Sequence, residues 1–322
     1  MANPPVDSTH LSDFARADMI DQYGGTVDSQ FAKKSIMRKF VPVKPVRGTD
    51  TLLNRRVGKT DLLAITPGVR PEVTQTEFGS ASVTVDTLIL ARDNRSQLNE
   101  FQTDFNARAE LGIDHGKELA KFFDEAFLIQ AAKGALLSAP SSLNSAFGAG
   151  KSTALTAAND QLDPDLLYTA IEGIVVEMQT DDMDTDECAI FLNPTQYAVI
   201  LNNDKLVDRD FSMDNGDFSN GKFKTIMGVP VIMTNRMATD GVAITHLLSN
   251  ASNSNAYDMT AAQAQVAAII MHPKALLAGE TIPLASDVFF DKVERSWFID
   301  SYLAFGVSNR LPGACGSVTW IT

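Results

Sequence analysis

The chain has 322 residues, of which 44% are hydrophobic, and its formal net charge at pH 7 is −13. This length can bury one large core or two modest ones, and because no run of about 18 apolar residues occurs, we expect no transmembrane helix. The acidic balance argues against a surface that holds nucleic acid by neutralising its phosphates. Residues 1–17 are polar and carry acids, so they do not have the pattern of a signal peptide.

The charge is distributed unevenly along the chain. Residues 1–60 carry a balance of +4, and the remainder carries −17. A basic segment on an acidic body can dock onto other copies of the chain or onto an acidic partner, and a solvated helix face is an equally open interpretation. The two cysteines, Cys188 and Cys315, have no CxxC spacing. We expect both to be small buried side chains in a reducing compartment.

Residues 1–50 have the pattern of an arm rather than a domain. Gly24-Gly25 is expected to interrupt it, a short basic amphipathic segment follows from Ser29 to Phe40, and Pro42 ends any helix there. Its apolar residues are too scattered to form a core, so they need another surface to cover them.

Residues 51–92 predict two extended strands joined by a long tip. The first strand is Leu52 to Ile65, broken at Gly58, and the return strand is Ser82 to Leu90. Thr66-Pro67-Gly68 predicts a turn at the tip. An isolated hairpin is marginally stable in water, so a projecting one implies a neighbour beneath it.

A helix of 40 residues is expected from Asn94 to Lys133, because apolar residues recur there in steps of three or four. Asn94 and Gln97 can form a capping box, and Gly134 is the expected stop. Unbroken, this helix would span ~60 Å, which suits a flat subunit of a shell better than a compact enzyme. Gly112 and Gly116 could instead split it into two helices.

The low-complexity stretch from Ser138 to Asn159 predicts a flexible surface loop. From Asp163 onward, helix and strand signals alternate, which is typical of an α/β lobe. The expected helices run from the cap Asp163-Pro164 to about Gln179 and from Asn193-Pro194 to Leu201, and the expected strands are Cys188–Leu192, Gly228–Met233, Gln265–Met271, Asp287–Asp291 and Trp297–Val307. Pro230 is expected at an edge or at a strand start, and Asp181 to Glu187 form an acidic loop.

No motif in the sequence predicts a catalytic, cofactor or metal site. Gly148 to Thr153 resembles a phosphate-binding loop, but Ser145 stands where that motif needs glycine, and no hydrophobic strand precedes it. Asp182, Asp184 and Asp186 match only the first spacings of a calcium loop. The four histidines lack zinc-site spacing, and no GxSxG sequence occurs.

Several short motifs, each weak alone, follow one another in a fixed order over residues 50–312. They are Val57-Gly58-Lys59-Thr60, Thr66-Pro67-Gly68, Val83-Thr84-Val85-Asp86, Phe191 to Leu201, Ile226 to Val231 and Met271-His272-Pro273. In this order they resemble the major capsid proteins of tailed double-stranded DNA phages, which have the Hong Kong 97 type of fold. More specifically, the chain looks like the coat proteins of short-tailed (podoviral) phages related to coliphage T-seven, the autographiviruses.

The resemblance implies an α+β fold of the Hong Kong 97 capsid type with five segments. These are residues 1–50 as the N-terminal arm, 51–92 as an extended β-hairpin loop, 93–160 as the peripheral domain with the spine helix, 161–272 as the axial domain and 273–322 as the return to the peripheral domain. The hairpin and the arm would flex at Gly58, Gly68 and Gly24-Gly25 to fit five-fold and six-fold surroundings.

The resemblance also implies a structural protein and not an enzyme. Its copies would assemble through a procapsid into pentamers and hexamers of an icosahedral phage head of triangulation number seven. This head would enclose packaged double-stranded DNA without sequence-specific binding. Scaffolding protein, portal and a decoration protein would be partners, no cofactor or membrane would be needed, and the virion would assemble in the host cytoplasm.

Assembly contacts are expected on the hairpin and on the arm. Those on the hairpin are Arg55, Arg56, Gly58, Lys59, Thr60, Pro67, Gly68 and Arg70, and those on the arm are Phe31, Lys33, Lys34, Arg38 and Lys39. An isopeptide cross-link between Lys59 and Asn309 is not expected, because the short-tailed relatives do not cross-link. The alternatives are an encapsulin-type nanocompartment shell protein and a soluble α/β nucleotide-binding enzyme that uses Gly150-Lys151-Ser152.

Overall fold

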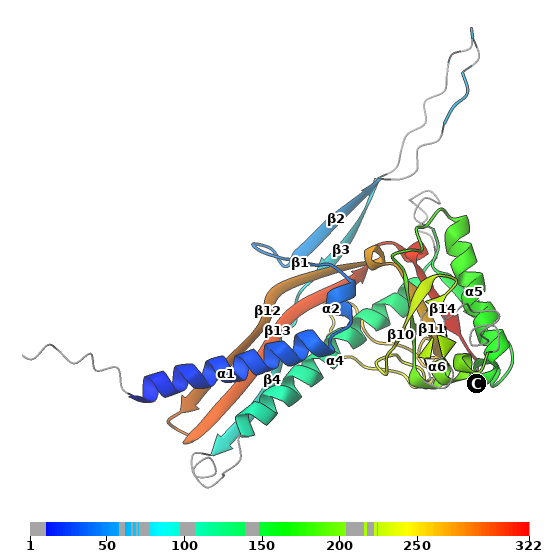
Figure 1. The fold of residues 1–322 in the computed structure, drawn as a ribbon. Coiled ribbons are helices and arrows are strands. Elements are labelled where there is room, and N and C mark those ends of the chain that lie inside the picture. Colours follow the sequence, from blue (N-terminus) through cyan, green and yellow to red (C-terminus); the bar gives the residue numbers. More distant parts are fainter. Residues whose placement is uncertain are drawn as a thin grey trace, which may run out of the picture. The chain divides into compact units, whose positions relative to one another are not determined.

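The computed structural model describes most of the chain in two compact units. The described residues are 11–57, 62–65, 67–68, 70, 78–96, 107–138, 148–203, 216–217, 222–223 and 225–321. The first unit comprises Met1–Lys39, Val85–Asp124 and Glu280–Phe305, and the second comprises Phe40–Thr84, Glu125–Gly279 and Gly306–Thr322. Helix and strand are mixed (Figure 1), as the predicted α+β class requires.

The first unit begins with helix α1 (Leu11–Lys34), which is followed by the short helix α2 (Met37–Phe40). The prediction that Gly24-Gly25 interrupts this region is wrong, because α1 runs through both glycines. A helical glycine costs about 1 kcal/mol relative to alanine. The helix buries Tyr23 and Val27 in the core of this unit, and that burial offsets the cost.

Helix α4 (Ala107–Ala135) is shorter than the predicted 40-residue helix, with 29 residues. Asn94 is not its cap, because it lies in strand β4 (Ile89–Ser96) opposite Phe298. Gln97 lies outside the described residues. Gly112 and Gly116 do not split the helix, which continues through both and ends one residue after the predicted stop.

A four-stranded sheet has the strand order β1-β12-β13-β4. Its strands besides β4 are β1 (Val43–Pro45), β12 (Leu276–Asp291) and β13 (Ser296–Asn309). In the first unit, β4 pairs antiparallel with β13, and α1 packs on this sheet through Tyr23, Val27, Val288 and Ile299. The strands predicted in the tail are confirmed, although β12 begins eleven residues earlier than expected.

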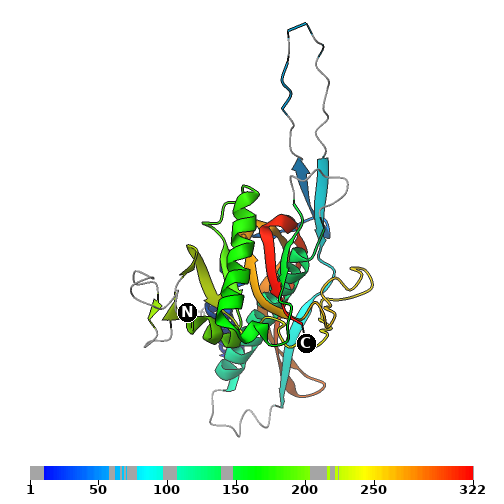
Figure 2. The same ribbon diagram turned by 90° about the vertical axis from the view of Figure 1, so that its right-hand side faces the viewer.

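The second unit contains the predicted hairpin as strands β2 (Thr51–Val57) and β3 (Phe78–Thr84), which pair antiparallel. The predicted first strand, Leu52 to Ile65, is too long, because residues 62–65 are not in a strand. The two strands form a ribbon of their own, seen from two sides in Figures 1 and 2. The predicted return strand Ser82–Leu90 is wrong, because the chain leaves β3 after Thr84 and Ile89 already starts β4. The predicted turn is confirmed at Pro67-Gly68, where Gly68 has φ +89°, and Gly58 lies outside the described residues.

The rest of the second unit is built on a six-stranded sheet with the order β5-β14-β11-β6-β10-β9. These strands are β5 (Lys151–Ala154), β14 (Cys315–Thr319), β11 (Val266–Met271), β6 (Ala189–Leu192), β10 (Val229–Met233) and β9 (Thr225–Ile226). With helices α5 (Pro164–Thr180) and α6 (Pro194–Leu201) they make what we call the α/β lobe. Its smaller elements are η2 (Asp160–Leu162), η3 (Pro273–Ala275), η4 (Pro312–Ala314), β7 (Gly216–Asp217) and β8 (Lys222–Phe223).

The lobe follows the sequence prediction closely. Asp163 caps α5 by accepting hydrogen bonds from the backbone N–H groups of Asp165 and Leu166, and Asn193 caps α6. Pro230 is the second residue of β10, as expected of a strand start. One prediction is wrong: residues 151–154 of the expected loop form β5, which pairs parallel with β14.

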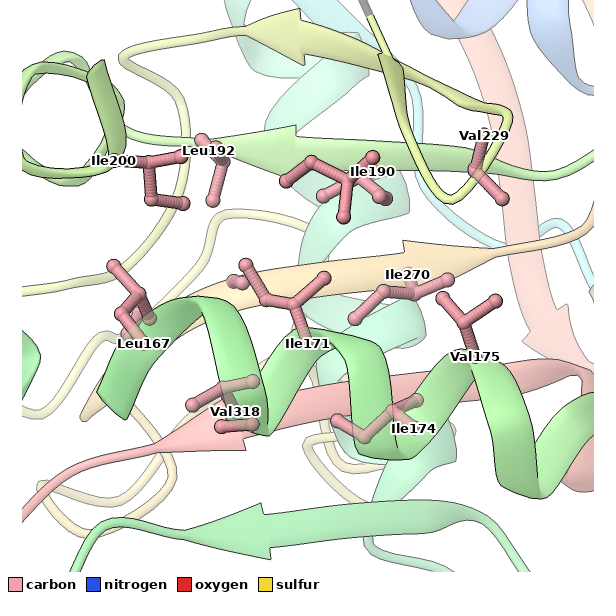
Figure 3. Packing of buried hydrophobic residues seen from close by; sticks show 14 of the residues in the cluster. Leu167, Ile171, Ile174, Val175, Ile190, Leu192, Ile200, Val229, Ile270 and Val318 are labelled. Atoms are coloured by element: carbon pink, nitrogen blue, oxygen red, sulfur yellow. The ribbon is translucent and has the colours of Figure 1, made fainter. Parts of the chain in front are cut away.

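The core of the lobe lies between α5 and the sheet. Leu167, Ile171, Ile174 and Val175 point from α5 toward the strands (Figure 3), and each is fully buried. Every residue of β6 and β11 is also buried, which is typical of central strands. The lobe therefore completes its own core.

Candidate assembly surface

The two faces of the β2–β3 hairpin are different. On the inner face, Leu52 lies opposite Val83, and a Cβ added to Gly279 of β12 would meet the side chains of Leu52, Val83 and Val46. A Cβ on Gly306 of β13 would lie 2.7 Å from the carbonyl oxygen of Thr84. The inner face thus lies directly on the backbone of two glycines, and glycine is needed there for the close approach.

The outer face of the hairpin carries apolar side chains that are not covered. Leu53 is 53% exposed, Val57 60% and Phe78 76%, and Val57 lies opposite Phe78 across the two strands. Val57 and Phe78 thus form an exposed apolar pair, and Leu53 lies on the same face beyond Arg55. Exposed apolar side chains of this size are typical of interaction sites.

The apolar character continues beyond β2 toward the tip. Leu62, Leu63 and Ile65 are 95%, 47% and 69% exposed. The predicted contacts Pro67, Gly68 and Arg70 are exposed as well, and Gly58, Lys59 and Thr60 lie outside the described residues.

The two predicted arginine contacts of the hairpin lie on opposite faces. Arg55 is exposed on the outer face, opposite Ser80. Arg56 is on the inner face and donates a hydrogen bond from Nη1 to the carbonyl oxygen of Arg310. Burial, followed by the nearby charge of Arg310, lowers the pKa of Arg56. Of these two arginines, Arg55 is therefore the one whose cation lies on the same face as the exposed apolar side chains.

The predicted contacts of the arm are also divided. Phe31 is buried and meets Phe123 edge to face with 5.6 Å between ring centroids. Arg38 donates to Glu280 at 2.8 Å, and its guanidinium lies 5.9 Å from the centroid of the Phe123 ring. The remaining three, Lys33, Lys34 and Lys39, are exposed.

Asp124 of α4 is a structural anchor that sequence reasoning missed. It is fully buried and accepts hydrogen bonds from the Ser35 hydroxyl at 2.8 Å and from the backbone N–H groups of Ile36 and Met37 at 2.8 and 3.1 Å. These N–H groups belong to the start of α2, whose first turn has no helical acceptor for them. No spacing in the sequence connects Asp124 with residues some 90 positions away.

The sequence prediction also missed Leu53, Val57 and Phe78, because the hairpin contacts that it singled out were glycines and cations together with Thr60 and Pro67. Strand alternation separates residues 53, 55 and 57 from 52, 54 and 56. That signal does not say which set faces outward. Phe78 precedes the return strand that was expected.

The position of Lys151 does not fit the alternative of a phosphate-binding loop. Lys151 begins the edge strand β5 and forms an ion pair with Asp181. A phosphate loop would lead from a strand into a helix N-terminus. Among the described residues, no group of three His, Cys, Asp or Glu side chains could hold a metal ion, and no helix could cross a membrane.

The cysteines are buried thiols, as predicted. Burial raises the pKa of Cys188 to about 11 and that of Cys315 to about 12. Neither is a thiolate near neutral pH, so neither has the character of a reactive cysteine.

Comparison with solved structures identifies the fold. The chain superposes on the mature capsid of bacteriophage PhiM1 with a TM-score of 0.77 and 23% identity, covering 100% of this chain and 91% of that one. The capsid of cyanophage P-SCSP1u gives 0.76 and 16% identity over 89% and 88% of the two chains. The chain has the Hong Kong 97 type of capsid fold. No protein-family model and no curated protein sequence matches the chain.

The chain is also similar, though less closely, to the protein of a virus-like particle from Pyrococcus furiosus. The TM-score is 0.52, with 13% identity over 93% of this chain and 98% of the other. The division of the chain into an arm, an extended loop, a peripheral domain, an axial domain and a returning segment stays a prediction.

Proposed function

We propose that the chain is a major capsid protein, which self-assembles into pentamers and hexamers of an icosahedral phage head around packaged double-stranded DNA. The observation that carries this proposal is the uncovered apolar outer face of the hairpin, formed by Leu53, Val57 and Phe78. Burying such a side chain fully is worth about 1.5–3 kcal/mol. A neighbouring copy gives that face a cover, and Arg55 beside it suits a carboxylate of the acidic neighbour.

The role is structural and needs no catalytic group. An overlapping hairpin and an arm can bury more than ~2,000 Å² on several neighbours at once, which is the size of obligate interfaces. We include the exposed cations Arg55, Arg70, Lys33, Lys34 and Lys39 among the contacts that select neighbours. Exposed pairs add little energy each, so they act mainly on register and specificity.

The proposal extends to the type of phage head and to the partners in its assembly. The head would be that of a short-tailed, T-seven-like phage with triangulation number seven, assembled in the host cytoplasm through a procapsid. Scaffolding protein, portal and a decoration protein would be partners. The net charge of −13 suits a container, because a wall that bound phosphates tightly would hinder both packaging and release of DNA.

An encapsulin-type nanocompartment is the second candidate, because a virus-like particle shares the fold. The TM-scores of 0.77 and 0.76 with phage capsids, against 0.52 with that particle, support the phage proposal. Purified particles that contain DNA would support a phage head, and particles that contain a protein cargo would support the nanocompartment.

The test compares two substitutions of the most exposed outer-face residue. Phe78→Asp places a charge in the interface that we propose, and Phe78→Leu keeps it apolar. We expect wild type and Phe78→Leu to form megadalton particles in size-exclusion chromatography and electron microscopy. Phe78→Asp should remain a folded, small oligomer or monomer by circular dichroism and light scattering. Normal shells from Phe78→Asp would overturn the proposal that this face is an assembly contact.

A further inference from the structure

In the first unit, α1 packs closely on α4 at two glycines of α4. A Cβ on Gly116 would lie 2.8 Å from the carbonyl oxygen of Val27, and one on Gly112 would lie 3.2 Å from the ring of Tyr23. The backbones can approach because these positions lack side chains. Phe31 of α1 also meets Phe123 of α4 edge to face, so the two helices pack closely along this stretch.

A chain of hydrogen bonds crosses the same contact. The Tyr23 hydroxyl of α1 lies 2.5 Å from Nδ1 of His115 on α4 and 2.6 Å from the Ser301 hydroxyl of β13. His115 Nε2 lies 3.2 Å from Asp93 Oδ2 of β4, and Ser301 lies 3.3 Å from the Ser286 hydroxyl of β12. All five side chains belong to the first unit, and Tyr23 is 1% exposed.

We propose that Tyr23 is a positioning residue that helps to hold α1 on α4 whether His115 is neutral or charged, because its hydroxyl can reverse the direction of its hydrogen bonds.

With His115 neutral, Nε2–H donates to the Asp93 carboxylate, and Nδ1 accepts a hydrogen bond from the Tyr23 O–H. The oxygen of Tyr23 then accepts from the Ser301 hydroxyl. With His115 protonated, Nδ1–H donates to the Tyr23 oxygen, and Tyr23 donates to Ser301. Ser301 in turn donates to Ser286. Each hydroxyl can donate one hydrogen bond and can also accept, so both arrangements use the same atoms at the same distances.

The charges around His115 are compatible with both states. Asp93 of β4 faces Nε2 directly, and a protonated imidazole forms an ion pair with it. Asp300 of β13 is near Tyr23 and is held by Arg92 of β4 in a bidentate pair at 2.8 and 2.6 Å. From β12, the contact in this network is the neutral Ser286. Burial, with smaller contributions from Asp300 and Asp93, raises the pKa of Tyr23 to about 12, so Tyr23 keeps its proton throughout.

The experiment measures amide hydrogen exchange of the α1 segment Tyr23–Lys34 in the full chain at about pH 8 and about pH 5, on either side of the ordinary titration range of histidine. Protection factors are corrected for intrinsic exchange. Wild-type protection should agree within about threefold at the two pH values. Tyr23→Phe should lose about fivefold at the higher pH, where a neutral bond is missing, and about fiftyfold at the lower, where a buried charged donor lacks its acceptor.

Three further variants separate this role from a merely structural one. His115→Gln does not titrate, so it should have the same profile at both pH values, and Tyr23→Phe combined with His115→Gln should lose the extra effect at low pH. Tyr302→Phe removes a hydroxyl that takes no part in this network and should match wild type.

Two results would overturn the proposal. One is a tenfold or larger loss of wild-type protection at the lower pH that His115→Gln does not share, because protonation would then break the contact. The comparison of wild type with His115→Gln tests the proposal even if Tyr23→Phe does not fold. The other is a Tyr23→Phe profile that follows wild type at both pH values.

Discussion

The α/β lobe and the β2–β3 hairpin belong to the same compact unit, and they cover their apolar side chains in different ways. Ile174 of α5 is fully buried, and Phe78 of the hairpin is 76% exposed. The lobe alternates helix and sheet, so each element covers its neighbour. The hairpin has one face on Gly279 and Gly306 and one face without cover. The difference teaches that the lobe covers its own apolar side chains, whereas the hairpin leaves one face exposed, which a neighbouring copy would cover in the assembly that we propose.

The sharpest contrast comes from truncating one residue in each region. Ile174→Ala should lower the free energy of unfolding by about 2–5 kcal/mol, since it leaves a cavity between α5 and the sheet. Phe78→Ala should change the subunit's stability by less than about 0.5 kcal/mol. Urea unfolding of the unassembled chain measures both. A large loss of subunit stability in Phe78→Ala would mean that the outer face is covered within the subunit.

Acid should weaken the second unit through His246. Its ring is buried, its Nδ1 accepts from the backbone N–H of Leu248 at 3.3 Å, and burial lowers its pKa to about 4. The unfolded chain binds this proton more readily, so stability falls from about pH 6.5 downward. The loss should reach about 3 kcal/mol near pH 4.

Urea titrations at several pH values measure this slope. His246→Gln should flatten it, leaving the smaller contribution of His272, whose pKa burial also lowers. An unchanged slope in His246→Gln would contradict the assignment.

Substitutions at two glycines, one beneath the hairpin and one on an exposed helix face, test how closely the hairpin packs on β12. A Cβ on Gly279 would lie 2.8 Å from Val46, whereas one on Gly173 of α5 meets nothing within 4 Å. Gly279→Val should therefore cost about 1–3 kcal/mol by overpacking beneath the hairpin. Gly173→Ala should stabilise the chain by about 0.5–1 kcal/mol, as expected for an exposed helix position. Thermal unfolding of the two variants measures both effects, and equal shifts would argue against a close seat at Gly279.

The smallest effect is expected at Lys151. Its ion pair with Asp181 is partly exposed, so Lys151→Ala should cost about 0.2–1 kcal/mol. We expect no nucleotide binding by the wild-type chain, measured with a fluorescent ATP analogue. Binding that disappears in Lys151→Ala would revive the enzyme alternative.

The accuracy of the sequence prediction follows the same contrast. In the lobe, Asp163-Pro164 and Asn193-Pro194 each carry a local cap, and both helices begin where the caps indicate. Near Asn94 the prediction failed, because a plausible cap preceded a helical pattern while the chain instead pairs with β13. That pairing joins residues about 200 positions apart, and no local pattern reports it.

The amino-acid sequence by itself determined helices α5 and α6 and strands β6, β10 and β11 of the lobe, the turn at Pro67-Gly68 and the absence of recognisable catalytic motifs. Caps, turns and strand periodicity depend on residues within a few positions of one another. Only the tertiary structure decided which face of the hairpin is uncovered, that α1 continues through Gly24-Gly25 and that Tyr23 meets His115. Each of these depends on contacts between distant segments, whose energies outweigh local preference.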